Sequence, residues 1–452
     1  MHPLSLKKKK SIFALILITS ILCSLIATGS ASIMPAITKT FHTPFSVGQW
    51  FTSIFSLVMG ILALCSAYLT RRFPAKPLFI TALCLFTFGI FLNGGATSFF
   101  LVLLGRALQA AGNGILISQC QILLLTMFDQ KIHGRIMGIY GLASYAAPVV
   151  SPLLFGLITD FWNWRIIFAV VGVFCIAAIL LAFFVMDNIT TVTQLPLDYI
   201  SLTLCILGFG GLLYGVGRPG NPSIMSFSSI GTILIGTLCC IFFILRQFYL
   251  KTPFLNIRIL TQKRLRLAVI ASALYYFIMI GLTVLTSYDI QQVHHYTVTT
   301  YGLMLIPGSL CTAVFNPFMG RIYDRSGIRN LLFLGSLFLI TGILGSGYHN
   351  GVVWIFILGN SLRAIGIAML MMPLVAWGVS RLPKKEIPSG QTLIVSIRTI
   401  SGSFGSAFGL VFAGFLGQYM RIETAMHLTY GVFILVACIL ALFSLAPSAQ
   451  NE

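Results

Sequence analysis

Charged side chains are scarce in this chain of 452 residues. Only 8% of the residues are charged and nine are acidic, whereas 58% are hydrophobic and the mean hydropathy is +0.97. A water-soluble globule covers itself with roughly 25% charged residues. The scarcity therefore excludes a water-soluble globular protein and indicates an integral membrane protein.

Familiar motifs of catalysis and metal binding are also missing. The sequence has no P-loop for nucleotide phosphates and no recognisable catalytic triad, and its ten cysteines show no CxxC spacing. All ten cysteines lie in apolar stretches, where cysteine behaves as a small apolar residue. We therefore expect no enzyme activity, no disulfide, no metal site and no cofactor, and we expect a proton gradient as the source of energy.

Long apolar segments recur along the whole chain. A helix of about twenty residues crosses the roughly 30 Å hydrocarbon core, where every backbone group must bond internally. The start of the chain resembles a signal peptide, but its apolar run is long and many spans follow, so we interpret it as an uncleaved first helix. The sequence predicts an all-α membrane protein with fourteen spans, at 11–37, 46–69, 77–97, 99–127, 134–158, 165–186, 199–217, 227–249, 267–290, 300–320, 329–347, 351–377, 389–416 and 424–446.

Basic residues predict the orientation of these spans. If Lys7 to Lys10 lie in the cytoplasm, the cytoplasmic segments hold 21 of the 28 Lys and Arg residues, the outer segments hold four and three lie within spans. Both termini are then cytoplasmic, with segment 218–226 outside and segment 250–265 inside. The net charge of +19 is explained by this topology and by anionic lipid at the cytoplasmic face, so no nucleic-acid partner is expected.

An internal repeat divides the chain into two similar parts. GRALQAAG at 105–112 aligns with GNSLRAIG at 359–366, and AYLTRRFPAK at 67–76 aligns with GRIYDRSGIR at 320–329 at nearly the same offset. Six helices need only about two hundred residues, so the surplus between the repeats fits two extra helices. The predicted organisation is a basic tail at 1–10, a six-helix bundle at 11–187, two linker helices at 188–250, a second six-helix bundle at 251–447 and a tail at 448–452.

Five motifs, in this order along the chain, resemble the major facilitator superfamily and, within it, the fourteen-helix drug:proton antiporter family. They are R-x-x-Q-x-x-G at 106–112, A-P-x-x-S-P-L-L-F-G at 147–156, WNWRIIF at 162–168, GRIYDRSGIR at 320–329 and SGQTLIVSIRTISGSFGSA at 389–407. The resemblance covers nearly the whole chain. It implies a major facilitator fold, with two pseudo-symmetric six-helix bundles rocking around a midplane cavity. It also implies a proton-coupled exporter of drugs or small metabolites; we expect a monomer in the plasma membrane, here the bacterial inner membrane.

Two of the motifs carry structural roles in the resembled family. The fifth helix would contact and seal the opposite half through the small residues of its antiporter-type motif, Ala147, Pro148, Ser151, Pro152 and Gly156. The loop motif would hold the cytoplasmic face closed through charge-assisted contacts of Gly320, Asp324, Arg325, Gly327 and Arg329. Ordinary helix packing and a solvated loop remain the respective alternatives.

The chain also departs from the pattern of this family. The first loop motif has Arg71 and Pro74 where the family has Asp and Gly, so its acidic latch is missing. In the first helix the family's acid is replaced by Ile26, while Thr28 remains. These departures argue against a standard exporter of cationic drugs.

Three arginines lie inside predicted spans. Arg106 is about seven residues, roughly 10 Å, from the outer end of its helix, and a charge at that depth must face a bundle interior or an aqueous cavity. We expect it to organise a proton or substrate cavity with Gln109 and Asn113; the alternative is that it only anchors helix packing. Arg363 and Arg398 lie near the midplane. Three inward arginines predict a positively biased cavity and an anionic or neutral amphiphilic substrate.

Asp289, in TSYDIQQVHH, is the carboxylate that lies nearest the interior of a span. If partly desolvated, it would exchange a proton with the outside or bind a cationic group on the substrate. Alternatively, it is a surface residue at the outer boundary. Both interpretations stay open, and we expect His294 and His295 to face solvent and the segment to lack a full set of zinc ligands.

Three functional hypotheses follow from the sequence. The leading one is proton-coupled export of a small anionic or neutral amphiphile. The second is proton-coupled uptake of an anionic compound such as a metal chelate, which the missing acid of the first helix favours. The third is a membrane sensor or scaffold without transport activity, for which the altered first loop motif is the only indication.

The orientation is testable by cysteine labelling in a cysteine-free background. We expect an impermeant thiol reagent on intact cells to label Pro222→Cys and to spare Asn256→Cys, because the basic residues concentrate around the second position. Labelling after the membrane is permeabilised, which should modify both positions, is the control. Labelling of position 256 but not of position 222 on intact cells would reverse the predicted topology.

Overall fold

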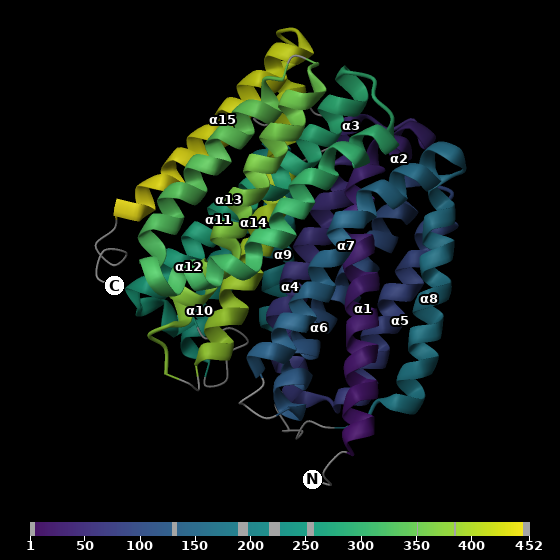
Figure 1. Ribbon diagram of the computed structural model, residues 1–452, viewed down its shortest axis with the longest axis vertical. Coiled ribbons are helices and arrows are strands. Elements are labelled where there is room, and N and C mark those ends of the chain that lie inside the picture. Colours follow the sequence, from purple (N-terminus) through teal and green to yellow (C-terminus); the bar gives the residue numbers. More distant parts are fainter. Residues whose placement is uncertain are drawn as a thin grey trace.

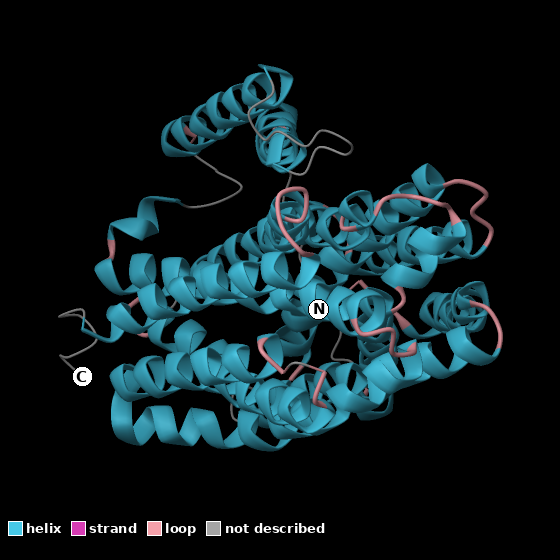
Figure 2. Ribbon diagram, turned by 90° about the horizontal axis from the view of Figure 1, so that it is seen from above, coloured by secondary structure: helices cyan, strands magenta, loops and turns pink. Residues whose placement is uncertain are grey.

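The computed structural model describes residues 5–128, 133–188, 198–216, 227–250, 257–349, 351–383 and 386–445. Within these ranges the chain is almost entirely helical and forms no strand (Figure 2). The α-helices are α1 (Leu6–Ser32), α2 (Met34–Thr40), α3 (Phe45–Gly48), α4 (Trp50–Arg72), α5 (Ala75–Gly94), α6 (Phe99–Met127), α7 (His133–Phe161), α8 (Trp164–Val185), α9 (Tyr199–Val216), α10 (Phe227–Tyr249), α11 (Lys263–Tyr288), α12 (Val298–Gly347), α13 (Val353–Val379), α14 (Ile387–Leu416) and α15 (Ile422–Leu442).

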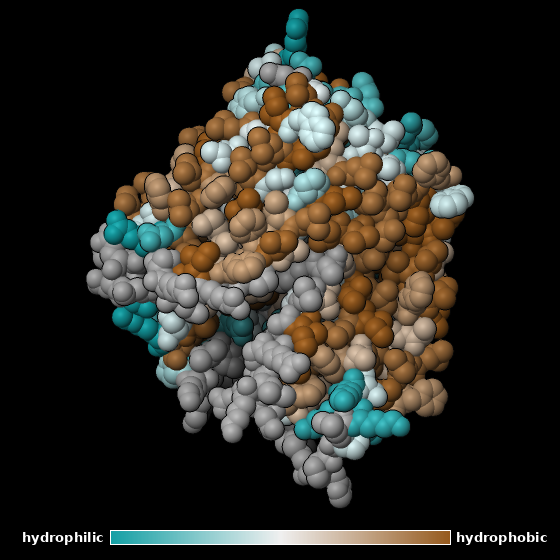
Figure 3. All heavy atoms as spheres, viewed as in Figure 1, coloured by the Kyte–Doolittle hydropathy of each residue, from teal (hydrophilic) through white to brown (hydrophobic). Residues whose placement is uncertain are grey.

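Each predicted span overlaps one of these helices. Among the described residues, eleven helical segments are long and apolar enough to cross a membrane, and shorter apolar segments lie on α4, α7 and α9. Large hydrophobic side chains are exposed along their outer faces, on α8 for example, and Figure 3 shows a surface on which hydrophobic residues dominate between the two ends. An apolar surface of this extent belongs in lipid. The chain is therefore a multi-pass membrane protein, while the count of fourteen spans stays a prediction.

Two helix boundaries depend on residues that interrupt helices. The predicted first span, 11–37, is wrong as a single helix, because α1 ends at Ser32 and α2 begins at Met34 with Pro35 in its first turn. The two predicted spans at 300–347 form one long element, α12, which breaks at Gly327. Gly327 has φ +68°, a conformation that glycine adopts without steric cost. The helix therefore changes course within the predicted loop motif.

The side chains of the loop motif are only partly described. Arg329 is exposed, whereas the side chains of Asp324 and Arg325 and the surroundings of Gly320 lie outside the described part of the structure. The same holds for the side chain of Arg71 in the first loop motif. The predicted cytoplasmic gate and its asymmetry between the halves therefore stay predictions.

The two halves of the chain meet through reciprocal helix pairs. The first half contains α1 and α4–α8, the second half contains α11–α15, and each half packs mainly within itself. Between the halves, α4 packs on α14 and α7 packs on α12. The two parts of α12 on either side of Gly327 count as the second and third helices of the second half, so α14 is its fifth. In the first half α4 is the second long helix and α7 is the fifth, so the two pairs are equivalent under exchange of the halves. This arrangement is the one expected of an internal repeat.

The linker helices α9 and α10 pack against each other, and α9 also contacts α4 and α14. Asp198, just before α9, forms an ion pair with Arg246 in the last turn of α10, at 2.9 Å. Partial burial raises the pKa of the Asp198 carboxyl, but hydrogen bonds from Arg246 and Ser201 outweigh that effect and hold its pKa below the ordinary value. The ion pair thus joins the two linker helices at one end.

Several hydrogen bonds between the halves lie near the end of the bundle opposite the two termini, where Figure 1 places α2 and α3. We call this end the distal face; it includes segments 33–49, 94–98, 289–297, 348–349, 351–352 and 417–421. There the hydroxyl oxygens of Ser53 on α4 and Ser406 on α14 lie 2.7 Å apart. The amide of Thr299 on α12 donates to Asp160 on α7 at 2.7 Å. These bonds hold the two halves together at the distal face.

Close backbone approach between α7 and α12 depends on glycine. A Cβ placed on Gly156 would lie 2.7 Å from Thr299 Cα, and one on Gly302 would lie 2.7 Å from the carbonyl oxygen of Pro152. Both distances are shorter than ordinary van der Waals contacts, and the obstructing atoms belong to the backbone. A larger residue at either position must therefore push the two helices apart.

We predict that Gly156→Val lowers the apparent Tm of the purified protein by several degrees, because overpacking a tight contact costs about 1–3 kcal/mol. The matched control is Gly414→Val on α14, where a Cβ meets nothing within 4 Å. Thermal unfolding of both variants in the same detergent is the measurement. Equal Tm values for the two variants would contradict a tight contact between α7 and α12.

Candidate functional site

Arg106 lies inside the first half, between α6 and α4. Its side chain is 1% exposed, and its guanidinium carbon lies 4.4 Å from the ring centre of Phe51 and 4.1 Å from that of Phe55. Its Nε donates to the carbonyl oxygen of Phe51 at 3.2 Å, and its Nη1 donates to Gln109 Oε1 at 3.0 Å. The positive charge is therefore held by two aromatic rings and two neutral acceptors, and no described carboxylate forms an ion pair with it.

The residues of the R-x-x-Q-x-x-G motif connect three helices. Gln109 donates from Nε2 to the carbonyl oxygen of Gly89 on α5 at 3.1 Å, and Asn113 points its amide at the sulfur of Met59 on α4 at 3.5 Å. Gly112 lets the backbone of α5 approach, since a Cβ there would collide with the carbonyl oxygen of Ala82. These contacts favour the packing interpretation of Arg106; a role in a cavity stays a proposal.

The second half contains a similar arginine–amide pair with its order reversed. Arg363 on α13 donates from Nη2 to Asn360 Oδ1 at 2.6 Å, and both residues are buried. In the aligned repeat, Asn360 corresponds to Arg106 and Arg363 corresponds to Gln109. A guanidinium and an amide one helical turn apart thus occur at equivalent places in both halves.

The three arginines that predict a positively biased cavity have separate partners, and their sharing of one cavity stays a prediction. Arg106 belongs to the first half, whereas Arg363 and Arg398 lie on α13 and α14 with separate partners. Arg398 is half-buried, and its guanidinium carbon lies 5.3 Å from the ring centre of Tyr276 on α11. Arg363 Nη1 and Arg398 Nε are both buried atoms without a hydrogen-bond partner. The second half therefore holds two guanidinium groups that each retain a free donor.

The antiporter-type motif faces both α1 and the opposite half. Ala147 and Ser151 are buried, and the Ser151 hydroxyl lies 2.8 Å from that of Thr28 on α1. Pro152 and Gly156 lie against α12, as described above. The side chain of Pro148 lies outside the described part of the structure. The α7 helix thus contacts the second half at the end of the bundle where the halves are joined.

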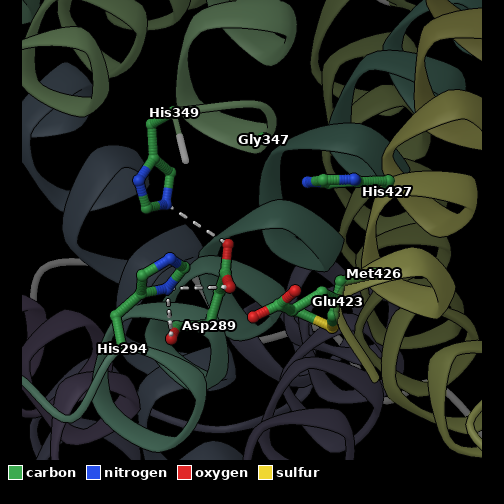
Figure 4. Close-up of a pocket in the computed structure, with 7 residues that line it drawn as sticks. All are labelled: Asp289, His294, Gly347, His349, Glu423, Met426 and His427. Atoms are coloured by element: carbon green, nitrogen blue, oxygen red, sulfur yellow. Dashed lines mark hydrogen bonds and ion pairs between the residues drawn. The ribbon is translucent and has the colours of Figure 1, made fainter. Parts of the chain in front are cut away.

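Asp289 is buried at the distal face of the second half, so its interpretation as a surface residue is wrong. It is 4% exposed and begins a π-helical turn, Asp289–Val293, that follows α11. The Tyr430 hydroxyl donates to its Oδ2 at 3.0 Å. His294 Nδ1 lies 3.4 Å from Oδ1, and His349 Nε2 lies 3.5 Å from Oδ2 (Figure 4). The carboxylate is thus surrounded by a phenol and two imidazoles.

The expectation that His294 and His295 both face solvent is half wrong. His295 is exposed, but the ring of His294 turns inward, and its centre lies 4.6 Å from the centre of the His349 ring. His349 escaped the sequence analysis because it follows α12, far from Asp289 along the chain. The predicted topology could have indicated that these histidines lie near one another. Each of three helix ends on the same face of the membrane has a histidine in or beside it, namely His294, His349 and His427.

A cavity of about 330 Å³ lies beside this group. Figure 4 shows side chains from the π-helical turn, from the end of α12 and from α15 around it. Two carboxylates and three imidazoles contribute to its lining, which consists of Asp289, His294, Gly347, His349, Glu423, Met426 and His427. The cavity therefore gathers three of the seven histidines of the chain and two of its nine acidic residues.

Comparison with known proteins agrees with this architecture. The sequence model of the Major Facilitator Superfamily matches residues 16–405 and 267–452. The MFS-type transporter YcnB of Bacillus subtilis (strain 168) is 34% identical over 377 residues, which are 83% of this chain and 80% of that protein. The chain belongs to the Major Facilitator Superfamily. It is a membrane transporter with the major facilitator fold that the motifs predicted.

More distant relatives of this superfamily member have names that refer to drugs. The lincomycin resistance protein LmrB of Listeria monocytogenes is 27% identical over 86% of this chain and 82% of that protein. The multidrug export protein EmrB of Haemophilus influenzae is 24% identical over 83% of this chain and 74% of that protein. Both agree with the predicted drug:proton antiporter family.

A solved structure of the superfamily fold is also similar. The peptide transporter POT in complex with sulfate has a TM-score of 0.71 at 14% identity, covering 97% of this chain and 95% of that chain. At this identity the likeness concerns the fold alone. It supports the arrangement of the helices in this superfamily member and says nothing of its substrate.

We predict that Arg106→Lys lowers the apparent Tm of this transporter by several degrees. A lysine ammonium replaces neither the planar stack between Phe51 and Phe55 nor the two directed hydrogen bonds, and each charged hydrogen bond contributes about 1.5–3 kcal/mol. Lys8→Ala, which removes an exposed ion pair with Asp187, is the control and should change Tm little. A wild-type Tm for Arg106→Lys would show that Arg106 does not brace α6 against α4.

Proposed function

We propose that this transporter exports a small amphiphilic compound, anionic or neutral, in exchange for protons. It does so by alternating access, in which the two halves rock against each other around a central site. The observation that carries the proposal is the reciprocal joining of the halves through α4–α14 and α7–α12 at the distal face.

A joint made of small contacts suits rocking. The contacts described above consist of small residues, single hydrogen bonds and close backbone approach, so few large side chains have to move when they separate. We place both termini in the cytoplasm of a bacterial cell, which puts the distal face outside. The described conformation is then closed toward the outside, and the next step of the cycle opens the distal face.

The unpaired donors of the second half support the substrate class. Arg363 Nη1 and Arg398 Nε are buried without acceptors, and an unpaired buried donor of this kind is costly. A carboxylate, phosphate or carbonyl group on a substrate would pair with them, whereas a fixed cation would be repelled. The absence of an acid at Ile26 points the same way.

The direction of transport is supported by the relatives. LmrB is named for lincomycin resistance and EmrB for multidrug export, and this chain covers most of the length of both proteins. These names favour export over the alternative of uptake. No relative identifies the compound that this chain carries.

Flux through purified protein in liposomes tests the proposal. Under an imposed pH gradient, we expect saturable movement of an anionic or neutral fluorescent amphiphile opposite to the proton flow, and a protonophore should abolish it. Movement in the same direction as protons would favour uptake, and no flux of any dye would favour a sensor or scaffold. Saturable transport of quaternary ammonium dyes in preference to anionic dyes would overturn the charge argument.

Locking the distal face tests alternating access directly. In a cysteine-free background, Ser53→Cys with Ser406→Cys should form a disulfide on oxidation, because the two hydroxyls lie 2.7 Å apart across the halves. We expect the disulfide to stop exchange and a reductant to restore it. The control pair, Ser20→Cys with Ser144→Cys, joins α1 and α7 within one half at the same 2.7 Å and should leave exchange intact. Full exchange with the distal disulfide formed would contradict opening at this face.

A further inference from the structure

We propose that the distal face carries a binding site for a divalent transition-metal ion of the zinc class. Its protein ligands are Asp289, His294 and His349. The site lies beside the cavity of the second half and is separate from the export of an amphiphile, so it stands or falls independently of the proposed function.

The three donor groups have the spacing of a metal site. One ligand atom from each residue lies within 4.8 Å of the other two, and His294 Nδ1 and His349 Nε2 lie 3.4 and 3.5 Å from the Asp289 oxygens. In a tetrahedral zinc site with nitrogen and oxygen ligands at about 2.0–2.1 Å, the ligand atoms are roughly 3.3 Å apart. Small movements of the side chains are enough to surround an ion.

The same distances are long for direct hydrogen bonds. Nitrogen–oxygen hydrogen bonds in proteins are about 2.7–3.2 Å long. His349 is 2% exposed, and its Nε2 has no hydrogen-bond partner although it points at the Asp289 carboxylate. A buried polar atom without a partner calls for an explanation, and a bound ion is one of them. An ion between the imidazole and the carboxylate would satisfy both groups.

Binding requires a change of proton position on His349. The amide of Gly351 donates to His349 Nδ1 at 3.0 Å, which leaves the ring proton on Nε2 when no metal is present. A metal ion on Nε2 needs the proton on Nδ1, so the ring gives up the Gly351 bond. Two N–H donors would then face each other, so the ring and the Gly351 amide must also move apart. This cost is offset by the free energy of binding a metal ion through several ligands.

The surroundings of the three ligands also suit a metal ion. Tyr430 donates to Asp289 Oδ2 and so orients the carboxylate, as the outer partners of metal ligands commonly do. The cavity beside the ligands also receives Glu423 and His427 from α15, which leaves room for water or for a fourth ligand. Two carboxylates around one cavity attract a cation.

The proposed site is connected to the joint between the halves. Gln291 lies in the same π-helical turn as Asp289, and its Nε2 donates to the carbonyl oxygen of Ser32 in the first half at 3.0 Å. An ion bound to Asp289 would order this turn and thereby strengthen the Gln291–Ser32 contact. We therefore expect a bound ion to stabilise the closed distal face.

Metal binding to the purified full-length chain, prepared without a histidine tag and stripped with a chelator, tests the proposal. We expect one equivalent of Zn²⁺ to bind in calorimetry and to raise the apparent Tm. Co²⁺ at the same site should show the visible absorption of a four-coordinate ion with nitrogen and oxygen ligands. Neither readout depends on transport, so a failure here is distinguishable from a failure of the proposed export.

Matched variants distinguish this site from adventitious binding. His294→Gln, His349→Gln and Asp289→Asn should each weaken Zn²⁺ binding by more than about tenfold, and Tyr430→Phe should weaken it roughly tenfold. His295→Asn is the control, because the neighbouring His295 is exposed and has φ +58°, which asparagine tolerates. Gln291→Ala should retain binding but lose much of the rise in Tm.

Two results would overturn the metal site. One is the absence of saturable Zn²⁺ binding to the wild-type chain, which would leave a cluster of histidines and aspartate without a metal. The other is equal affinity in the wild-type chain, in His294→Gln and in His349→Gln, which would place the ion elsewhere. Because His294 is only partly buried, His294→Gln keeps the test valid if a variant of buried His349 fails to fold.

Discussion

A polar side chain inside a membrane-spanning bundle must find its partners within the protein, and this constraint shapes the interior of both halves. Water is absent from the hydrocarbon core, so an unpaired polar group there is costly. Arg106 meets the constraint with two aromatic rings, a backbone carbonyl and Gln109, without a carboxylate. Arg363 meets it only in part, through Asn360. Arg106 thus has partners on all sides, whereas Arg363 keeps one N–H donor without an acceptor.

The polar side chains therefore have different surroundings in the two halves. The first half has its polar motif packed between α4, α5 and α6, where it braces helices. The second half contains the free guanidinium donors, the buried Asp289 and the cavity with three histidines. Within the described ranges, the second half holds more buried polar atoms without a hydrogen-bond partner than the first half does.

The distal face contains both a contact between the halves and the buried Asp289 carboxylate. Gln291 contacts the first half two residues beyond Asp289, so the segment that joins the halves is the same segment that holds the carboxylate. A π-helical turn is suited to this position, because such turns are rare and often occur at functional sites. The ion that we propose at Asp289 would therefore bind two residues away from a contact between the halves.

Hydropathy, charge and repeated motifs determined the class of this protein, its helices and its superfamily, because spans of about twenty apolar residues follow directly from the thickness of the bilayer. The break at Gly327 was also readable, since it falls in a loop motif between two spans. The sequence did not reveal the ring stack around Arg106 or the approach of His349 and Tyr430 to Asp289. Those contacts join residues that lie far apart along the chain, and a span's depth in the membrane says nothing of the direction of a side chain around its helix. Only the packing of the helices decided which polar groups meet and which remain unpaired.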